Sequence, residues 1–278
     1  MKLSVVIPAY NEEKNIGHTL EEIQKVLWRE KISYEIIAVN DNSKDGTKGV
    51  IQSFMDNDQN IKTVDRKPPG GFGRAIRSGL ELVQGDVVII YMADLSDDPE
   101  DLIKYYRKIE EGYDCVFGSR FGTGSRVEHY PKGKLIANRI INKIIQLMFW
   151  TKHNDLTNAF KAYRTHVIKE CGPFQASHFN ITIEMSINAL IRNYSIAKCP
   201  INWYGRTWGE SNLKIGEMGR RYLSVLLKLF FERTLISDDL IADRLSMRAS
   251  EKDQLESIKS NIDSMTKRIE TLEEKVNQ

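Results

Sequence analysis

Short, uninterrupted apolar runs alternate with amphipathic segments through the first half of this 278-residue chain. Runs that lack a polar residue at every second position are typical of strands buried on both faces of a sheet. The segments between them carry apolar residues at helical spacing, as Ile16, Leu20, Ile23 and Leu27 do. Strands that alternate with helices predict an α/β fold, in which helices cover both faces of a mainly parallel sheet.

The expected elements follow this rhythm. The expected strands span residues 3–7, 35–39, 61–64, 87–91 and 115–117. The expected helices of this half span residues 12–29, 44–55, 72–83 and 99–110. In the less regular second half, we expect helices over residues 135–149, 180–191 and 217–233, and a strand-like stretch over residues 195–204.

Charge and cysteine content exclude several classes of protein. The 40 Lys and Arg residues nearly balance the 38 Asp and Glu residues, so the net charge of +2 gives no indication of a nucleic-acid-binding protein. The three cysteines, Cys115, Cys171 and Cys199, are far apart, which argues against a disulfide framework and favours a reducing compartment. The N-terminal apolar run is too short for a secretory leader, and no apolar stretch reaches about 18 residues. We therefore expect a cytoplasmic protein.

The composition changes after Ser237, where glycine, proline and aromatic residues stop. Beyond this point, apolar residues recur at alternating spacings of three and four, at Leu255, Ile258, Ile262, Met265, Ile269, Leu272 and Val276. This heptad pattern predicts a coiled coil. We expect one domain over residues 1–236 and a helical coiled-coil tail over residues 237–278 that makes the protein a homo-oligomer. The alternative is a single amphipathic helix that folds back on the body.

Polar loops follow four of the expected strands, at residues 8–13, 40–47, 70–74 and 92–99. In open parallel sheets, ligands bind beyond the carboxyl ends of the strands, where these loops lie. Each loop alone also reads as a turn or a helix cap, and Asn11 is the expected N-cap of the first helix. Together the four loops predict a nucleotide site. The helix start at Gly73 and Arg74 suits a phosphate.

Several of these segments share their order with the motifs of a known family. They read VVIPAYNEE, VNDNSKDGT, GFGRAIRSG, MADLSDDPE and FGSRF. This set resembles the motifs of inverting family-two glycosyltransferases, and most nearly those of the dolichol- and polyprenyl-phosphate mannose synthase group. Residues 155–161 resemble that group's Asp-x-x-Ser-Gly-Phe-Arg, and residues 206–213 resemble its Arg-x-x-Gly-Glu-Ser-Lys-Leu. The resemblance covers residues 3–235 and implies the Rossmann-like GT-A fold.

The resemblance also implies which residues hold a nucleotide-sugar donor. With the helix start included, the expected donor-binding residues are Pro8, Ala9, Tyr10, Glu12, Asn40, Asp41, Gly73, Arg74, Ala93, Asp94 and Ser211. Asp94 matches the last Asp of the family's Asp-x-Asp motif, which implies a bound Mg²⁺ or Mn²⁺. Met92 stands where the first Asp is expected, and a thioether is a poor ligand for a hard cation. We therefore expect Asp94 to hold the metal with diphosphate oxygens and water, helped by Ser96 or Asp97; the alternative is a weaker dependence on metal. Asn40 likewise departs from the family's Asp-Asp pair.

The implied reaction moves a single sugar with inversion at its anomeric carbon. Asp94, through the metal, and Arg206 are the expected catalytic residues that stabilise charge on the leaving diphosphate. A hydroxyl acceptor also needs a general base, for which Glu184 and Asp155 are the candidates. A phosphate acceptor is already anionic and needs basic residues to hold it instead.

The stretch 119–143 is rich in basic residues, among which Arg120, Lys134 and Arg139 are the expected acceptor-binding residues. The favoured acceptor is therefore a polyprenyl phosphate. The first alternative is a hydroxyl of a glycan or lipid-linked saccharide, and the second is a non-catalytic scaffold with a decayed donor site. The expected helices 135–149 and 217–233 combine basic with apolar residues. They are either peripheral docking helices at the inner membrane face or parts of the core or an oligomer interface.

Overall fold

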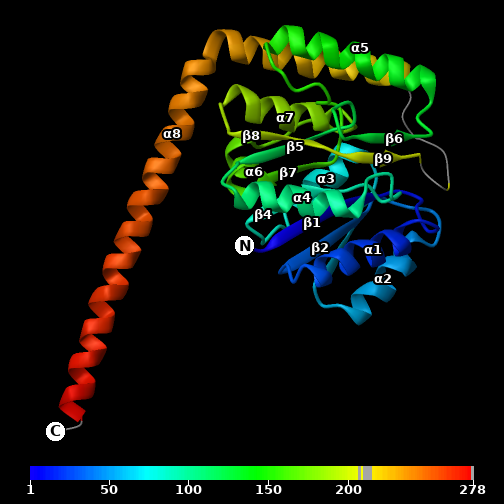
Figure 1. Ribbon diagram of the computed structural model, residues 1–278. Helices are drawn as coiled ribbons and strands as arrows, with labels where there is room; N and C mark the ends of the chain where they lie inside the picture. The colour runs from blue at the N-terminus through cyan, green and yellow to red at the C-terminus, as the bar shows by residue number, and fades with distance from the viewer. Residues whose placement is uncertain (206–207, 209–214, 277–278) are drawn as a thin grey trace. The chain divides into compact units, whose positions relative to one another are not determined.

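A computed structural model describes residues 1–205, 208 and 215–276 of the chain (Figure 1). The chain divides into two compact units, Met1–Thr234 and Leu235–Gln278. The first unit contains the whole of the main sheet, and the second is helical.

The first unit is built on a seven-stranded sheet in the order β3-β2-β1-β4-β7-β5-β8. The strands are β1 (Leu3–Ala9), β2 (Tyr34–Asn40), β3 (Ile61–Asp65), β4 (Val87–Ile90), β5 (Cys115–Ser119), β7 (Lys161–Arg164) and β8 (Ile196–Pro200). Strands β1 to β4 pair in parallel, with Leu3 opposite Tyr34 and Ala9 opposite Asn40. Every residue of β1 and β2 is buried, as expected for strands covered on both faces.

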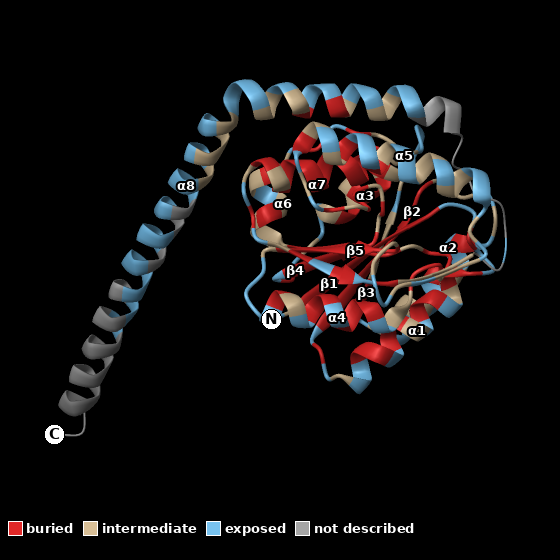
Figure 2. Cartoon of the chain, turned by 45° about the horizontal axis from the view of Figure 1, so that its top comes forward, coloured by how far each residue is buried: buried red, intermediate tan, exposed pale blue. Residues whose placement is uncertain are grey.

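Helices cover both faces of this sheet (Figures 1 and 2). One face carries α1 (Ile16–Arg29), α2 (Thr47–Asn57) and α4 (Pro99–Glu110). The other carries α3 (Phe72–Leu80), α6 (Thr165–Cys171) and α7 (Ile181–Ile191). The apolar stripe of α1 that the sequence shows is buried in the core. The fold is therefore the expected α/β fold, with loops gathered at the carboxyl ends of β1, β2 and β4.

The antiparallel strand β7, between β4 and β5, is absent from the expected elements. Its sequence KAYR contains Lys161 and Arg164 and gives no apolar run. Lys161 is nevertheless fully buried, because its Nζ donates to Leu156 O at 2.6 Å and to Ser186 Oγ at 2.6 Å. Burial lowers the pKa of Lys161 to about 7. Helix α6 and strand β6 (Arg126–Glu128) are likewise absent from the expected elements, whereas β8 and β9 (Asn202–Tyr204) both lie within the expected strand-like stretch 195–204.

The expected cap at Asn11 is wrong. Helix α1 begins at Ile16, and Asn11 adopts a left-handed conformation with φ of 54°. Its side-chain oxygen accepts from Lys44 N at 2.8 Å, and its own N–H donates to Ser43 Oγ at 3.0 Å. Asn11 therefore ties the loop after β1 to the loop after β2.

Two long helices complete the chain, α5 (Lys132–Phe149) and α8 (Ile215–Val276). Helix α8 is interrupted at Ile236, where φ of −136° is not helical. In the second unit, the apolar side chains of Ile258, Ile262 and Met265 are exposed. No described helix is apolar over a length that could cross a bilayer.

Candidate active site

A cavity of about 900 Å³ opens at the carboxyl edge of the parallel strands. One side is formed by the loops after β1, β2 and β4 and by the start of α3. The other side is formed by α5, by residues 129–131 before it, and by the beginning of α8. The cavity therefore joins the loops expected to hold a donor to the helices expected to hold an acceptor. Of the residues expected at the site, those that line it are Pro8, Ala9, Tyr10, Glu12, Asp41, Ala93, Asp94, Arg120 and Lys134.

The loops after β1 and β2 hold each other in place. Glu12 N donates to Thr47 Oγ1 at 2.8 Å, and the buried Glu12 carboxylate accepts from Asn15 Nδ2 at 2.6 Å. Asp41 accepts from Gly71 N at 2.6 Å and forms an ion pair with Arg66. These contacts fix the first wall of the cavity before any ligand binds.

Asn40 is buried next to this wall but does not line the cavity. Its Nδ2 donates to Asp65 Oδ1 at 2.9 Å, and its Oδ1 accepts from Ser43 N at 3.2 Å. Its side chain thus shapes the turn after β2, where the sequence suggested contact with a nucleoside.

The start of α3 does not offer the free phosphate site that its glycines suggest. The N–H groups of Gly73 and Arg74 both donate to Ser177 O, at 3.1 and 3.3 Å. A Cβ at Gly73 would lie 2.4 Å from Ala176 O, so glycine is required for this close approach. Neither Gly73 nor Arg74 lines the cavity, and Arg74 Nη1 donates to Gly70 O at 2.8 Å. The amino terminus of α3 is therefore capped by the carbonyl oxygen of Ser177.

The loop after β4 brings two acidic residues to the cavity lining, Asp94 and Asp97, and the carboxylate oxygens of Asp97 are buried. Asp94 is buried, and its Oδ1 accepts from Ser96 N at 3.2 Å. Asp97 is 1% exposed, and neither of its carboxylate oxygens has a hydrogen-bond partner among the described residues. Burial, together with the charge of Asp94, raises the pKa of Asp97 well above its usual value. Met92 also lines the cavity at this point.

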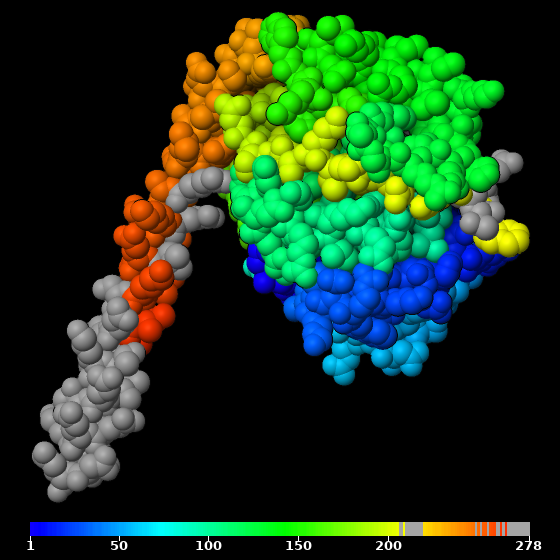
Figure 3. All heavy atoms as spheres, in the orientation of Figure 1, coloured from blue at the N-terminus to red at the C-terminus, as the bar shows by residue number. Residues whose placement is uncertain are grey.

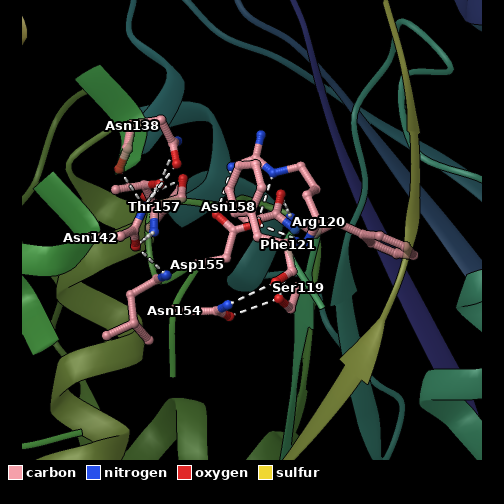
Figure 4. A network of polar contacts seen from close by, with 12 residues as sticks. Ser119, Arg120, Phe121, Asn138, Asn142, Asn154, Asp155, Thr157 and Asn158 are labelled. Carbon is pink, nitrogen blue, oxygen red and sulfur yellow. Dashed lines mark hydrogen bonds and ion pairs between the residues drawn. The ribbon is translucent and has the colours of Figure 1, made fainter. Parts of the chain in front are cut away.

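Arg120 is held by a buried ion pair with Asp155 (Figure 4). Its Nε and Nη2 donate to the two Asp155 oxygens at 2.8 and 2.7 Å, and its backbone N donates at 3.0 Å. The guanidinium also lies over the rings of Phe121 and Tyr130. Asp155 is therefore a positioning partner of Arg120 in this structure.

A polar network attaches α5 to the segment that carries Asp155 (Figure 4). Asn142 Oδ1 accepts from Leu156 N at 2.7 Å, and its Nδ2 donates to Thr157 Oγ1 at 2.8 Å. Asn138 Nδ2 donates to the same Thr157 hydroxyl at 2.8 Å. The inner face of α5 is thus tied to the residues that orient Arg120.

Two further expected site residues lie away from the cavity lining. The buried Glu184 carboxylate accepts from Gln175 N at 2.9 Å and from Ala176 N at 2.8 Å, so it anchors the segment before α7. Arg139 lies over Phe121, with its guanidinium carbon 4.6 Å from the ring centroid. Arg206 and Ser211 lie outside the described residues.

Aromatic residues that are not among the expected site residues also line the cavity. They are Phe72, Tyr130, Phe179, Trp203 and Tyr222. Phe72 and Phe179 stack with ring centroids 4.2 Å apart. Residues so far apart in sequence meet only through the fold, so no local pattern could have identified them as a group.

Comparison with known proteins identifies relatives over most of the first unit. The family described as "Glycosyl transferase family 2" matches residues 4–172. A dolichol-phosphate mannosyltransferase of Pyrococcus furiosus is 31% identical over 240 residues, which cover 82% of this chain and 64% of that protein. An undecaprenyl-phosphate 4-deoxy-4-formamido-L-arabinose transferase of Shewanella sediminis is 31% identical over 170 residues, which cover 60% of this chain and 49% of that protein. The chain thus spans less than two thirds of the length of both relatives.

A solved structure has the same fold. Glucosyl-3-phosphoglycerate synthase from Mycobacterium tuberculosis, in complex with Mn²⁺, UDP and glucosyl-3-phosphoglycerate, matches with a TM-score of 0.62 at 19% identity. The match covers 82% of this chain and 79% of that chain. It confirms the GT-A fold that the motifs imply.

Proposed function

Because the chain belongs to glycosyl transferase family 2, we propose that it moves a single sugar from a GDP- or UDP-linked donor to a polyprenyl phosphate. The observation that carries this proposal is the charge distribution along the cavity. The carboxylates of the lining, Glu12, Asp41, Asp94 and Asp97, all lie on the donor loops, together with the single cation Lys44. On the α5 and α8 side the charged described residues are Lys134 and Arg221, and Arg120 lines the cavity just after β5. An anionic acceptor fits that basic side. The two relatives whose names specify a polyprenyl-phosphate substrate agree with this choice.

The donor loops fit a divalent metal, Mg²⁺ or Mn²⁺. Asp94, which lines the cavity and matches the last Asp of the Asp-x-Asp motif, would hold it. A structural relative solved in complex with Mn²⁺ and UDP supports a divalent metal on this fold. When bound, such an ion stabilises negative charge on the leaving diphosphate. Arg206 and Ser211, outside the described residues, remain the proposed protein contacts of that diphosphate.

In the proposed step, the bond between the anomeric carbon and the donor diphosphate breaks. An oxygen of the acceptor phosphate forms the new bond from the opposite side, so the configuration inverts. This acceptor needs no general base, which agrees with the position of Glu184 against backbone amides and of Asp155 against Arg120. Both candidate bases for a hydroxyl acceptor are thus engaged in structural contacts.

An acceptor comparison tests this function. The protein is incubated with GDP- and UDP-sugars and, in separate assays, with a polyprenyl phosphate, the matching polyprenol or a glycan. Mass spectrometry should detect a lipid-linked monosaccharide only with the phosphate, and NMR should show the inverted anomer. Transfer to the free alcohol or to a glycan hydroxyl, without transfer to the phosphate, would support the hydroxyl-transferring alternative. If no sugar is transferred from any donor, the result would favour the alternative of a non-catalytic scaffold with a decayed donor site.

We further propose that α5 and the first part of α8 dock on an anionic bilayer. Their outer faces expose a stripe of large apolar side chains: Ile136, Ile140, Ile144 and Leu147 on α5, and Leu223, Leu227 and Phe231 on α8. The two helices lie side by side in Figures 1 and 2, and orange atoms of α8 adjoin green atoms of α5 in Figure 3. The ring centroids of Phe149 and Phe230 are 6.4 Å apart. All the charged residues of α5 are basic. Apolar stripes flanked by basic residues are typical of interfacial helices.

Vesicle binding tests the docking surface. Ile140→Asp should weaken binding to phosphatidylglycerol-containing vesicles, measured by sedimentation, roughly ten- to a hundredfold, because an apolar side chain that enters the bilayer contributes about 1.5–3 kcal/mol. Leu82→Asp, the same kind of change at an exposed apolar residue outside these helices, should bind as the unchanged protein does. The proposed docking surface would be contradicted if neither variant lost vesicle binding, or if both lost it to the same extent.

For residues 237–278, we propose self-association through the heptad pattern. Removing the chain from Ser237 onward should lower the mass measured by light scattering to that of a smaller species. Retention of the same oligomer would assign its interface to the remaining body instead.

A further inference from the structure

We infer that Asp97 is a second protein ligand of the divalent metal and takes the place that Met92 cannot fill. This inference rests on the proposed function, because the metal is the one that accompanies a nucleotide-sugar donor. It concerns a residue outside the two positions of the Asp-x-Asp motif.

Among the described residues, Asp97 differs from the other deeply buried carboxylates in that its side-chain oxygens have no hydrogen-bond partner. Asp101 accepts from Asn202 N and from Lys104, Asp155 accepts from Arg120, and Glu184 accepts from backbone N–H groups. Both oxygens of Asp97 lack a hydrogen-bond donor within the described part of the chain. A buried carboxylate without a partner is costly, so it is retained where a proton or a cation neutralises it.

The position of Asp97 favours a cation from the cavity. Asp94 and Asp97 both line it, and between them Leu95 takes a left-handed conformation with φ of 52°. Arg120, the nearby cation, already donates two side-chain hydrogen bonds to Asp155. Those donors are therefore not available to Asp97, and a cation that enters the cavity would give its carboxylate the counter-charge that the described residues do not supply through hydrogen bonds.

Two carboxylates are enough for this type of metal site. The described residues contain no group of three or more His, Cys, Asp and Glu side chains placed to hold a metal. Mg²⁺ is commonly held by one or two carboxylates together with substrate phosphates and water. Asp94 and Asp97 would supply the protein ligands, and the donor diphosphate would supply further oxygens. Met92, which lines the same cavity, offers only a soft thioether sulfur.

Mn²⁺ binding measured by electron paramagnetic resonance tests this assignment without sugar transfer. The titration uses Mn²⁺ with GDP or UDP, whichever the unchanged protein binds. Asp97→Asn should weaken Mn²⁺ binding at least tenfold, while nucleotide binding without metal stays the same. Asp98→Asn is the matched control, because it makes the same change one residue on and asparagine still caps α4. It should bind Mn²⁺ as the unchanged protein does.

A rescue variant separates ligation from a merely structural role. Met92→Asp in the Asp97→Asn background should restore Mn²⁺ binding to within a few-fold, because it returns a second carboxylate to the loop. Asp97→Ser is made alongside, so that a second neutral variant is available if asparagine prevents folding. Unchanged Mn²⁺ affinity in a folded neutral variant would overturn the inference, as would failure of the rescue. If the unchanged protein binds neither nucleotide, the proposed function fails first, so the two failures are distinguishable.

Discussion

Asp94→Asn is expected to lower the turnover number for sugar transfer roughly a hundred- to a thousandfold. Asp94 lines the cavity beside the expected diphosphate position, and the metal it would hold stabilises the leaving charge by several kcal/mol. Each 1.36 kcal/mol lost from that stabilisation slows the reaction about tenfold. The measurement is the initial rate of lipid-linked sugar formation at saturating donor and acceptor.

The same Asp98→Asn variant provides the control for this rate. It changes a carboxylate of the same loop that caps α4 and does not line the cavity. Its rate should stay within a few-fold of the unchanged protein, and circular dichroism should show that both variants are folded. A folded Asp94→Asn variant with near-normal turnover would remove Asp94 from the mechanism.

Breaking the buried pair between Arg120 and Asp155 is expected to have the largest effect on stability. Asp155→Asn leaves the Arg120 guanidinium buried without its counter-charge, which typically lowers the free energy of unfolding by about 3–5 kcal/mol. Urea denaturation at neutral pH measures this loss. The double variant Arg120→Met with Asp155→Leu should recover much of it, because two apolar side chains leave no charge unpaired.

The double variant also separates stability from acceptor binding. Arg120 lines the cavity, so its loss should raise the KM for polyprenyl phosphate far more than the KM for the donor. Arg164→Met is the matched control, because Arg164 lies at the end of β7 and is not among the lining residues. A stable double variant with an unchanged acceptor KM would show that Arg120 serves only the fold.

The sequence predicted the parallel half of the sheet well, because β1, β2 and β4 are continuous apolar runs with helices between them. It failed at β7, whose pairing with β4 and β5 depends on neighbours distant in the chain. The burial of Lys161 in that strand relies on Leu156 and Ser186, which no local pattern connects to it.

The candidate site shows the same division. The loops that line the cavity directly follow strands, so their positions could be predicted from the strands themselves. The roles of individual side chains could not, because they depend on partners from elsewhere. Ser177 O accepts hydrogen bonds from the N–H groups at the start of α3, and the N–H groups of Gln175 and Ala176 donate to the Glu184 carboxylate. The sequence offered both Ser96 and Asp97 as helpers of Asp94, and only the burial of the Asp97 carboxylate without a hydrogen-bond partner among the described residues favours Asp97.

The central claim is that the cavity binds a nucleotide-sugar donor, and calorimetric titration tests it most directly. GDP and UDP are each titrated into the full chain with and without Mn²⁺. We predict that one of them binds at one nucleotide per chain, that Mn²⁺ strengthens this binding, and that Asp94→Asn removes the strengthening. Absence of binding by both nucleotides, with and without Mn²⁺, would contradict the claim.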